Sequence, residues 1–148
     1  MRTFSLVLLF SFLSATPVMS QTDEYFDLND YRWKNRVLLI FSPNASNADY
    51  RNQMKTLKSK TASDGLKERD LKVFRVIHQR GPMLRDLKIP EEKYESLRAR
   101  YSVDPYTYTM VLIGKDGGEK ERFGSAVQLS RIFERIDEMP MRKLEIDG

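Results

Sequence analysis

The chain has 148 residues, of which 41% are hydrophobic and 31% are charged, and its formal net charge is +4. These values are typical of one globular domain and exclude a disordered or fibrous chain. The sequence contains no cysteine and a single histidine. Thiol catalysis, disulfide exchange, iron–sulfur clusters and cysteine-liganded zinc are therefore excluded, and a Ser-His-Asp hydrolase or a His-rich metal site is disfavoured.

Residues 1–20 have the pattern of a secretory signal peptide. Arg2 supplies a positive charge, the apolar run 4–13 follows it, and a small residue stands just ahead of Gln21. This order of regions fits cleavage before Gln21, with Ala15 as a second candidate site. A membrane anchor would need about 20 apolar residues, and this run has about half as many. We therefore predict an exported chain, periplasmic or secreted, without a stable membrane anchor.

The mature domain, residues 21–148, keeps a mild excess of positive charge. Basic and acidic residues alternate along most of it, as in Lys67, Glu68, Arg69 and Asp70. Nucleic-acid interfaces need clustered basic residues, so this pattern favours a solvated surface and predicts no nucleic-acid partner. An exported domain without disulfides depends on its core, which is commoner in the bacterial periplasm than among small secreted eukaryotic domains.

Four segments have the pattern of β-strands. The run Val37–Phe41 is continuously apolar, which is typical of a strand buried on both faces in the middle of a sheet. A Gly-rich turn at 114–118 predicts a hairpin, because Asp-Gly and Gly-Gly supply the positive φ angles of tight turns. A charged edge strand follows that turn. The predicted strands cover residues 37–41, 71–77, 108–113 and 119–123.

Three helices are predicted between and after these strands. The first covers 48–60, with Gly65 beyond its end as a breaker. The second begins at Pro90 and two acidic residues, and the third follows Ser125 and Gln128, which are spaced as a capping box. Their apolar faces carry Tyr50, Met54 and Leu57, then Tyr94, Leu97 and Tyr101, then Leu129, Ile132, Phe133 and Ile136.

Two terminal segments flank this core. Residues 21–35 form an aromatic lead-in that is expected to pack over one edge of the sheet through Phe26, Leu28, Tyr31 and Trp33. Residues 139–148 are expected to form a tail. No repeat, low-complexity tract or linker interrupts the chain, so residues 21–148 are predicted to be one domain.

The order of elements, β-α-β-α-β-β-α with a tight hairpin before the last strand, resembles the thioredoxin core. Right-handed crossovers in this α/β fold predict the strand order 2-1-3-4, with the last strand antiparallel. Thioredoxins begin the first helix with a redox Cys-x-x-Cys, but the matching residues 46–49 are Ser-Asn-Ala-Asp and form no redox couple. The place of the usual cis-proline falls near Thr109, and Pro105 lies too early. These departures favour the peroxiredoxin-like branch.

A closer resemblance covers nearly the whole mature chain. Four segments are similar to the signatures of a domain-of-unknown-function family of small exported bacterial proteins: Trp33–Phe41, Glu68–Leu71, Val111–Gly118 and Ile136–Arg142. That family resembles the C-terminal domain of the vertebrate sushi-repeat-containing proteins and equarin, a peroxiredoxin-like group. The resemblance implies a thioredoxin-like, extracytoplasmic domain and assigns no catalytic residue.

The loop Ser42–Asp49 is the predicted ligand-binding site. It leaves the carboxyl end of a central strand and enters a helix N-terminus, where unpaired N–H groups favour an anion or a polar ligand. Short polar side chains and one nearby cation suit such contacts, so the candidate ligand-binding residues are Asn44, Ser46, Asn47, Asp49 and Arg51. The alternative is that Asn47 or Ser46 only caps the helix.

Two further patterns resemble binding sites for phosphate or metal. The turn 114–118 lacks the spacing of a phosphate-binding loop and precedes a strand, so a hairpin is favoured. Met139, Met141 and His78 have donor atoms for a soft metal, but packing roles are favoured for the methionines and a surface or hydrogen-bonding role for the histidine. We predict no metal site and no cofactor.

Three tyrosines and two arginines form a last candidate group. Tyr101, Tyr106 and Tyr108, with Arg98 and Arg100, have the composition of a stacking platform for a base or a sugar. Core packing is favoured, because Tyr101 shares a core-facing stripe of its helix.

These observations favour a non-catalytic, exported, thioredoxin-like module that binds a peptide, a protein or a small polar ligand. The alternatives are an enzyme without thiol chemistry, such as a hydrolase or the carrier of a bound ion, and a structural or envelope-stress protein. A cluster of buried, convergent ionisable groups would favour the enzyme.

Overall fold

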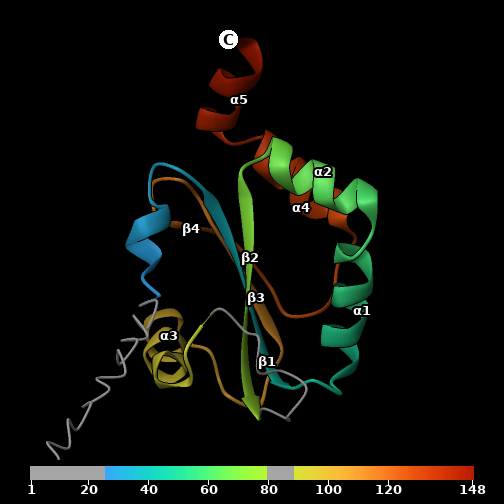
Figure 1. Ribbon diagram of the computed structural model, residues 1–148, viewed down its shortest axis with the longest axis vertical. Coiled ribbons are helices and arrows are strands. Elements are labelled where there is room, and N and C mark those ends of the chain that lie inside the picture. The colour runs from blue at the N-terminus through green and yellow to red at the C-terminus, as the bar shows by residue number, and fades with distance from the viewer. Residues whose placement is uncertain (1–25, 80–88) are drawn as a thin grey trace, which may run out of the picture.

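A four-stranded sheet in the order β2-β1-β3-β4 forms the centre of the computed structural model, which describes residues 26–79 and 89–148 (Figure 1). The strands are β1 Arg36–Asn44, β2 Leu71–Gln79, β3 Thr109–Ile113 and β4 Glu119–Phe123. β2 is parallel to β1, while β3 is antiparallel to both β1 and β4. The predicted order 2-1-3-4 and the antiparallel last strand are confirmed. Because β3 opposes β1, the crossover rule applies only between β1 and β2.

The apolar run of β1 explains its central place. Val37 through Phe41 are all at most 2% exposed. Val37, Leu39 and Phe41 point into the core on one face of the sheet, whereas Leu38 and Ile40 point into the core on the other. Side chains alternate along a strand, so a strand covered on both faces must be apolar at every position.

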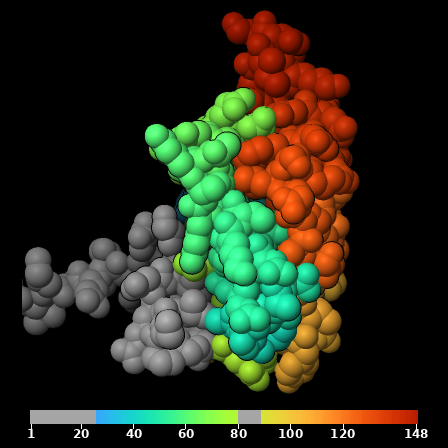
Figure 2. Space-filling view, turned by 90° about the vertical axis from the view of Figure 1, so that its right-hand side faces the viewer, coloured from blue at the N-terminus to red at the C-terminus, as the bar shows by residue number. Residues whose placement is uncertain are grey.

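Helices cover both faces (Figure 1). α3 Tyr94–Tyr101 packs on one face. The 3-10 turn η3 Glu91–Lys93 precedes it and occupies the place where the sequence predicted the helix to begin, at Pro90. α1 Ala48–Leu57, α2 Lys60–Glu68 and α4 Leu129–Asp137 lie together on the other, and Figure 2 shows them as one continuous surface. None of the helices in the described part of the chain is long and apolar enough to cross a membrane.

The single helix predicted over 48–60 is wrong in its extent, because two helices occupy residues 48–68. The break lies at Lys58 and Ser59, and the Ser59 hydroxyl caps α2 by accepting from the backbone N–H of Ala62 at 3.0 Å. Gly65 lies inside α2 and does not end a helix. A Cβ atom at Gly65 would overlap the ring of Phe133 on α4, so glycine here permits close helix packing.

The predicted capping box at Ser125 and Gln128 is also wrong. α4 begins at Leu129, and the side chain of Gln128 makes no capping hydrogen bond. Two α1 side chains hold the preceding segment extended: Asp49 Oδ1 accepts from Ala126 N at 2.9 Å and Gln53 Oε1 accepts from Val127 N at 2.9 Å. The helix therefore starts four residues after Ser125.

The lead-in is described from Phe26 onward. Phe26 and Tyr31 pack on Phe74 of β2, with ring centroids 4.9 and 5.0 Å away, so this segment covers the edge strand. The 3-10 turn η1 Leu28–Tyr31 follows Phe26 and ends at Tyr31. Trp33 differs from the expected packing, since it is 61% exposed and has a φ of 67°. Its N–H donates to Lys115 O at 2.6 Å, which holds this uncommon backbone conformation.

The predicted tail contains α5 Pro140–Asp147, which projects from one end of the molecule (Figure 1). The predicted hairpin turn joins β3 to β4, with Gly117 at a φ of 83° and its N–H donating to Gly114 O at 2.9 Å. The predicted signal peptide lies outside the described residues.

Candidate functional site

The loop predicted to bind ligand joins the end of β1 to the start of α1. Asn44 Oδ1 accepts from the backbone N–H of Ser46 at 3.0 Å and from its hydroxyl at 2.8 Å. The buried Ser42 hydroxyl donates to Asn44 O at 2.8 Å. The structure thus brings Asn44 and Ser46 together, and short polar contacts fix the loop.

Asn47 caps α1, because its Oδ1 accepts from Tyr50 N at 3.0 Å. The capping role that the sequence offered as an alternative is therefore present. Asp49 turns away from the other candidates and toward the segment before α4, where it accepts from Ala126 N. Arg51 is exposed on the first turns of α1. Of the five predicted residues, three form the loop surface and two lie on the helix.

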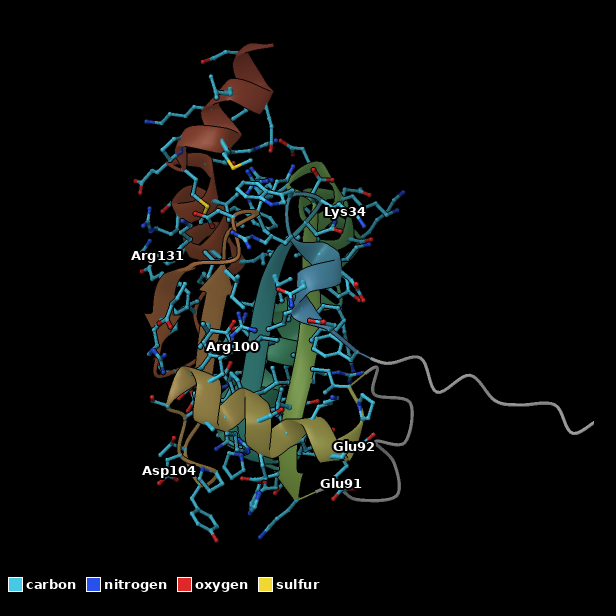
Figure 3. All side chains as sticks on the ribbon, turned by 90° about the vertical axis from the view of Figure 1, so that its left-hand side faces the viewer. Lys34, Glu91, Glu92, Arg100, Asp104 and Arg131 are labelled. Atoms are coloured by element: carbon cyan, nitrogen blue, oxygen red, sulfur yellow. The ribbon has the colours of Figure 1, made fainter. Side chains whose placement is uncertain are left out.

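A pair of aromatic rings, an exposed tyrosine and a half-buried histidine, lies at the same end of the sheet. Tyr106 is 71% exposed, and its ring meets the His78 ring edge-on with centroids 5.3 Å apart. Its N–H donates to Asp104 Oδ1 at 2.7 Å, and Figure 3 shows Asp104 at the end of the molecule where β2 finishes. In the sheet, Phe41 of β1 pairs with Thr109 of β3, and Asn44 of β1 pairs with Gln79 of β2. The rings of Tyr106 and His78 therefore flank the end of β1.

The other two tyrosines of the predicted group are core residues, while Tyr106 is not. Tyr101 and Tyr108 are 7% and 6% exposed, and their hydroxyls have no hydrogen-bond partner among the described residues. Burial raises the pKa of Tyr108, and the nearby Asp49 carboxylate raises it further. The guanidinium of Arg98, buried at 3% exposure, lies 5.8 Å over the Phe41 ring, and Arg100 lies over Tyr101.

A second cluster of charged residues lies at the opposite end of β1. Arg36 is 1% exposed, and its Nη atoms donate to Arg69 O at 3.0 Å and to both Glu145 oxygens at 3.2 Å. Lys115 Nζ donates to Asp70 at 2.8 Å and to Glu145 at 2.7 Å. This cluster attaches α5 to the sheet.

The pKa values of this cluster show the effect of its ion pairs. Burial raises the pKa of Glu145, but hydrogen bonds from Lys115 and Arg36 outweigh it and the net pKa is lowered. Asp137 behaves in the same way, because Arg69 and Arg142 both donate to its carboxylate. Each carboxylate is held in its charged form, which is the state that stabilises the fold.

His78 and the two methionines, for which packing or surface roles were favoured over metal binding, lie at opposite ends of β1. His78 sits between the pairs Ser42–Ile77 and Asn44–Gln79, whereas Met139 and Met141 line a cavity with Arg36. No group of three His, Cys, Asp or Glu side chains in residues 26–79 and 89–148 has the arrangement of a metal site.

Solved structures show the same fold. The reduced 2-Cys peroxiredoxin of Plasmodium vivax is 18% identical, covers 79% of this chain and 84% of its own, and has a TM-score of 0.58. A DsbH oxidoreductase is 14% identical, covers 89% of this chain and 96% of its own, and has a TM-score of 0.51. The fold is thioredoxin-like, and the absence of cysteine separates this chain from thiol peroxidases.

Curated relatives are similar over most of this chain. The sushi repeat-containing protein SRPX of Rattus norvegicus is 30% identical over 122 residues, which are 80% of this chain and 26% of that protein. Coiled-coil domain-containing protein 80 of Danio rerio is 30% identical over 130 residues, 80% of this chain and 15% of its own length. The chain thus spans about a quarter or less of these relatives. A family model described as Domain of unknown function (DUF4174) matches residues 27–145, and the chain belongs to that family.

Proposed function

We propose that the chain is an exported, non-catalytic binding module that holds a peptide or protein segment at the end of β1. The binding surface consists of the loop residues Asn44, Ser46 and Asn47 together with Tyr106 and His78. The observation that carries the proposal is the exposure of Tyr106, whose position is fixed by contacts within the chain. Its ring contacts the His78 ring edge-on, and its backbone N–H donates to the Asp104 carboxylate.

Such a surface suits recognition more than it suits catalysis. An exposed tyrosine offers a large contact area with few rotatable bonds, which is why tyrosine is common at binding hot spots. The hydrogen bonds of Asn44 and Asn47 order the loop in advance, so little conformational entropy is lost when a partner binds. Arg51 adds a positive charge on the first turns of α1.

The pKa shifts of the acidic residues favour binding over the alternative of a non-thiol enzyme. A catalytic acid or base usually has a carboxyl pKa raised toward neutral pH. In residues 26–79 and 89–148, the carboxyl groups with shifted pKa values are Asp116, Asp137 and Glu145, and all three are lowered. Cationic hydrogen-bond partners lower them, as is typical of structural ion pairs.

Export is the second part of the proposal, and it rests on the signal-peptide pattern of residues 1–20. The positive charge, apolar run and small residue occur in the required order. The mature chain would then act in the periplasm or outside the cell. Sequencing the N-terminus of the exported protein should give Gln21, and an intact Met1 would contradict this part.

Selection from a displayed random-peptide library on the immobilised mature domain tests binding. Enriched peptides should lose at least about tenfold in affinity for Tyr106→Ala, because the side chain removed is the exposed anchor. Lys143→Ala, an exposed change on α5 at the other end of the molecule, is the matched control and should bind normally. A library that yields no enriched sequence, or peptides that bind Tyr106→Ala unchanged, would overturn the proposal.

A further inference from the structure

The outer side of α1 carries a stripe of basic side chains. Arg51, Lys55 and Lys58 follow one another at spacings of four and three residues, so they lie along one side of the helix. All three are exposed, while Tyr50 and Gln53 on the inner side are buried. Figure 2 looks onto the outer side, where α1 and α2 form the teal and green surface. We call Arg51, Lys55 and Lys58 the basic stripe.

The basic stripe has no carboxylate partner in the described part of the chain. Its three side chains make no ion pair and no hydrogen bond within residues 26–79 and 89–148. The arginines of the neighbouring helix α4 differ, because Arg131 and Arg135 both pair with Glu121 of β4. The charges of the basic stripe are therefore open to a partner from outside the chain.

The sequence around the basic stripe is also free of acidic residues. Residues 50–63 contain four basic residues and no aspartate or glutamate, unlike the mixed charges along most of the chain. Asp49 precedes this stretch, but its carboxylate accepts from Ala126 N before α4. Asp64 follows it on α2 and pairs with none of the three cations. The chain itself thus leaves the positive charge of this side uncompensated.

The stability of α1 does not account for these charges. Like charges three or four residues apart repel each other on a helix and destabilise it slightly. The helix dipole favours Lys55 and Lys58 near the C-terminal end, but it opposes Arg51 within the first four residues. A negatively charged partner would remove the repulsion within the basic stripe.

The basic stripe begins at the proposed peptide-binding surface. Asn47 belongs to that surface and caps α1, and its carbonyl accepts from Arg51 N at 3.0 Å. One line of residues therefore continues from the loop along the helix. From Arg51 to Lys58 the helix rises by about 10 Å. In an extended peptide, alternate side chains point the same way about 6.5–7 Å apart, so two or three acidic residues at alternate positions cover this length.

We infer that the peptide held at the end of β1 is acidic, with carboxylates at alternate positions along the basic stripe. This inference rests on the proposed function, because the loop and Tyr106 must hold the same peptide. A nucleic acid fits less well, since its sites use larger basic surfaces than three cations on one helix. An acidic peptide uses both the polar loop and the basic stripe.

Selection of one random-peptide library in parallel on three forms of the mature domain tests the inference. The first form is the unchanged protein. The stripe variant replaces the three cations of the basic stripe: Arg51→Gln, Lys55→Gln and Lys58→Gln. The control variant removes the same charge at three exposed lysines that also lack an ion pair in the described residues: Lys34→Gln, Lys67→Gln and Lys143→Gln. Aspartate and glutamate at alternate positions should be enriched on the unchanged and control forms and not on the stripe variant.

Fluorescence anisotropy with the most enriched peptide measures the size of the effect. Its affinity should fall about tenfold on the stripe variant and less than about twofold on the control variant, because exposed ion pairs each contribute a factor of roughly 1.5–5. A peptide with its carboxylates changed to amides should lose the same factor on the unchanged protein and nothing more on the stripe variant. Salt should weaken binding to the unchanged protein and have little effect on the stripe variant.

The possible outcomes separate this inference from the proposed function. Peptides that lose affinity for Tyr106→Ala but bind the stripe variant unchanged would overturn the inference and leave the proposed function in place. A library that yields no enriched sequence would overturn both. A single-stranded DNA oligonucleotide that binds as tightly as the enriched peptide would overturn the choice of an acidic peptide and identify a general surface for polyanions.

Discussion

Glu145 on the last helix accepts two hydrogen bonds of 3.2 Å from Arg36, which lies 109 residues earlier at the start of β1. The guanidinium and the carboxylate meet in a bidentate pair, the strongest common geometry for these groups. Lys115 from the β3–β4 turn donates to the same carboxylate. The last helix, α5, is therefore attached to the sheet and is part of the fold.

Glu145→Gln should destabilise the domain by about 1–3 kcal/mol, because the buried Arg36 would lose its counter-charge. The Glu145 side chain keeps 27% exposure, so water moderates the loss and the lower part of the range is expected. Glu134→Gln, an exposed change on α4, should alter stability by less than about 0.5 kcal/mol. Urea unfolding measures both, and equal midpoints would contradict the structural role of the pair.

Stability should fall as the solution is acidified. The pKa values of Asp137 and Glu145 are lowered in the folded state, so the unfolded chain binds more protons at acidic pH. Their contribution is complete above the ordinary carboxyl pKa of about 4 and is lost as the pH falls through the lower folded values. Asp137→Asn with Glu145→Gln should flatten the slope of unfolding free energy against pH between about pH 5 and pH 2. A slope as steep as that of the unchanged protein would show that other groups control it.

Local signals made the sheet predictable. The apolar run 37–41 gave a buried central strand, and the Asp-Gly-Gly turn gave the hairpin, where Gly117 has the expected positive φ. Both depend on neighbouring residues alone. The start of α4 was not predictable in this way, because Asp49 and Gln53, more than 70 positions earlier, bind the N–H groups before it.

In the candidate site, too, local contacts could be predicted from the sequence and distant ones could not. The cap at Asn47 could be predicted, because its partner lies three residues away. The exposure of Tyr106 could not be predicted, because a tyrosine beside a core strand is more often buried. The Arg36–Glu145 ion pair could not be predicted either, because no sequence pattern shows which of the many charged residues contact each other across 109 positions.

Gly65→Ala should destabilise the domain by about 1–3 kcal/mol although alanine favours helices, because its Cβ overlaps the Phe133 ring. Gly124→Ala is the matched control: in the described part of the chain no atom lies within 4 Å of the added Cβ, and the position needs no positive φ. Thermal melting compares the two. A higher melting temperature for Gly65→Ala would mean that helix propensity outweighs the contact.

Asn47→Ala should cost about 1 kcal/mol of stability, with a range of roughly 0.5–2 kcal/mol, because α1 loses the oxygen that accepts from Tyr50 N. Asn47→Asp keeps an oxygen at the same place and adds a negative charge at a helix N-terminus, where the helix dipole favours it. This variant should therefore be as stable as the unchanged protein. Chemical unfolding of the two variants measures the cap, and an aspartate variant as unstable as the alanine variant would show that the amide nitrogen of Asn47, and not its oxygen, matters to the fold. Peptide binding measured on the stable aspartate variant then tests the proposed ligand role separately from the cap, because Asn47→Asp keeps the capping oxygen and removes the Nδ2 donor from the proposed binding surface.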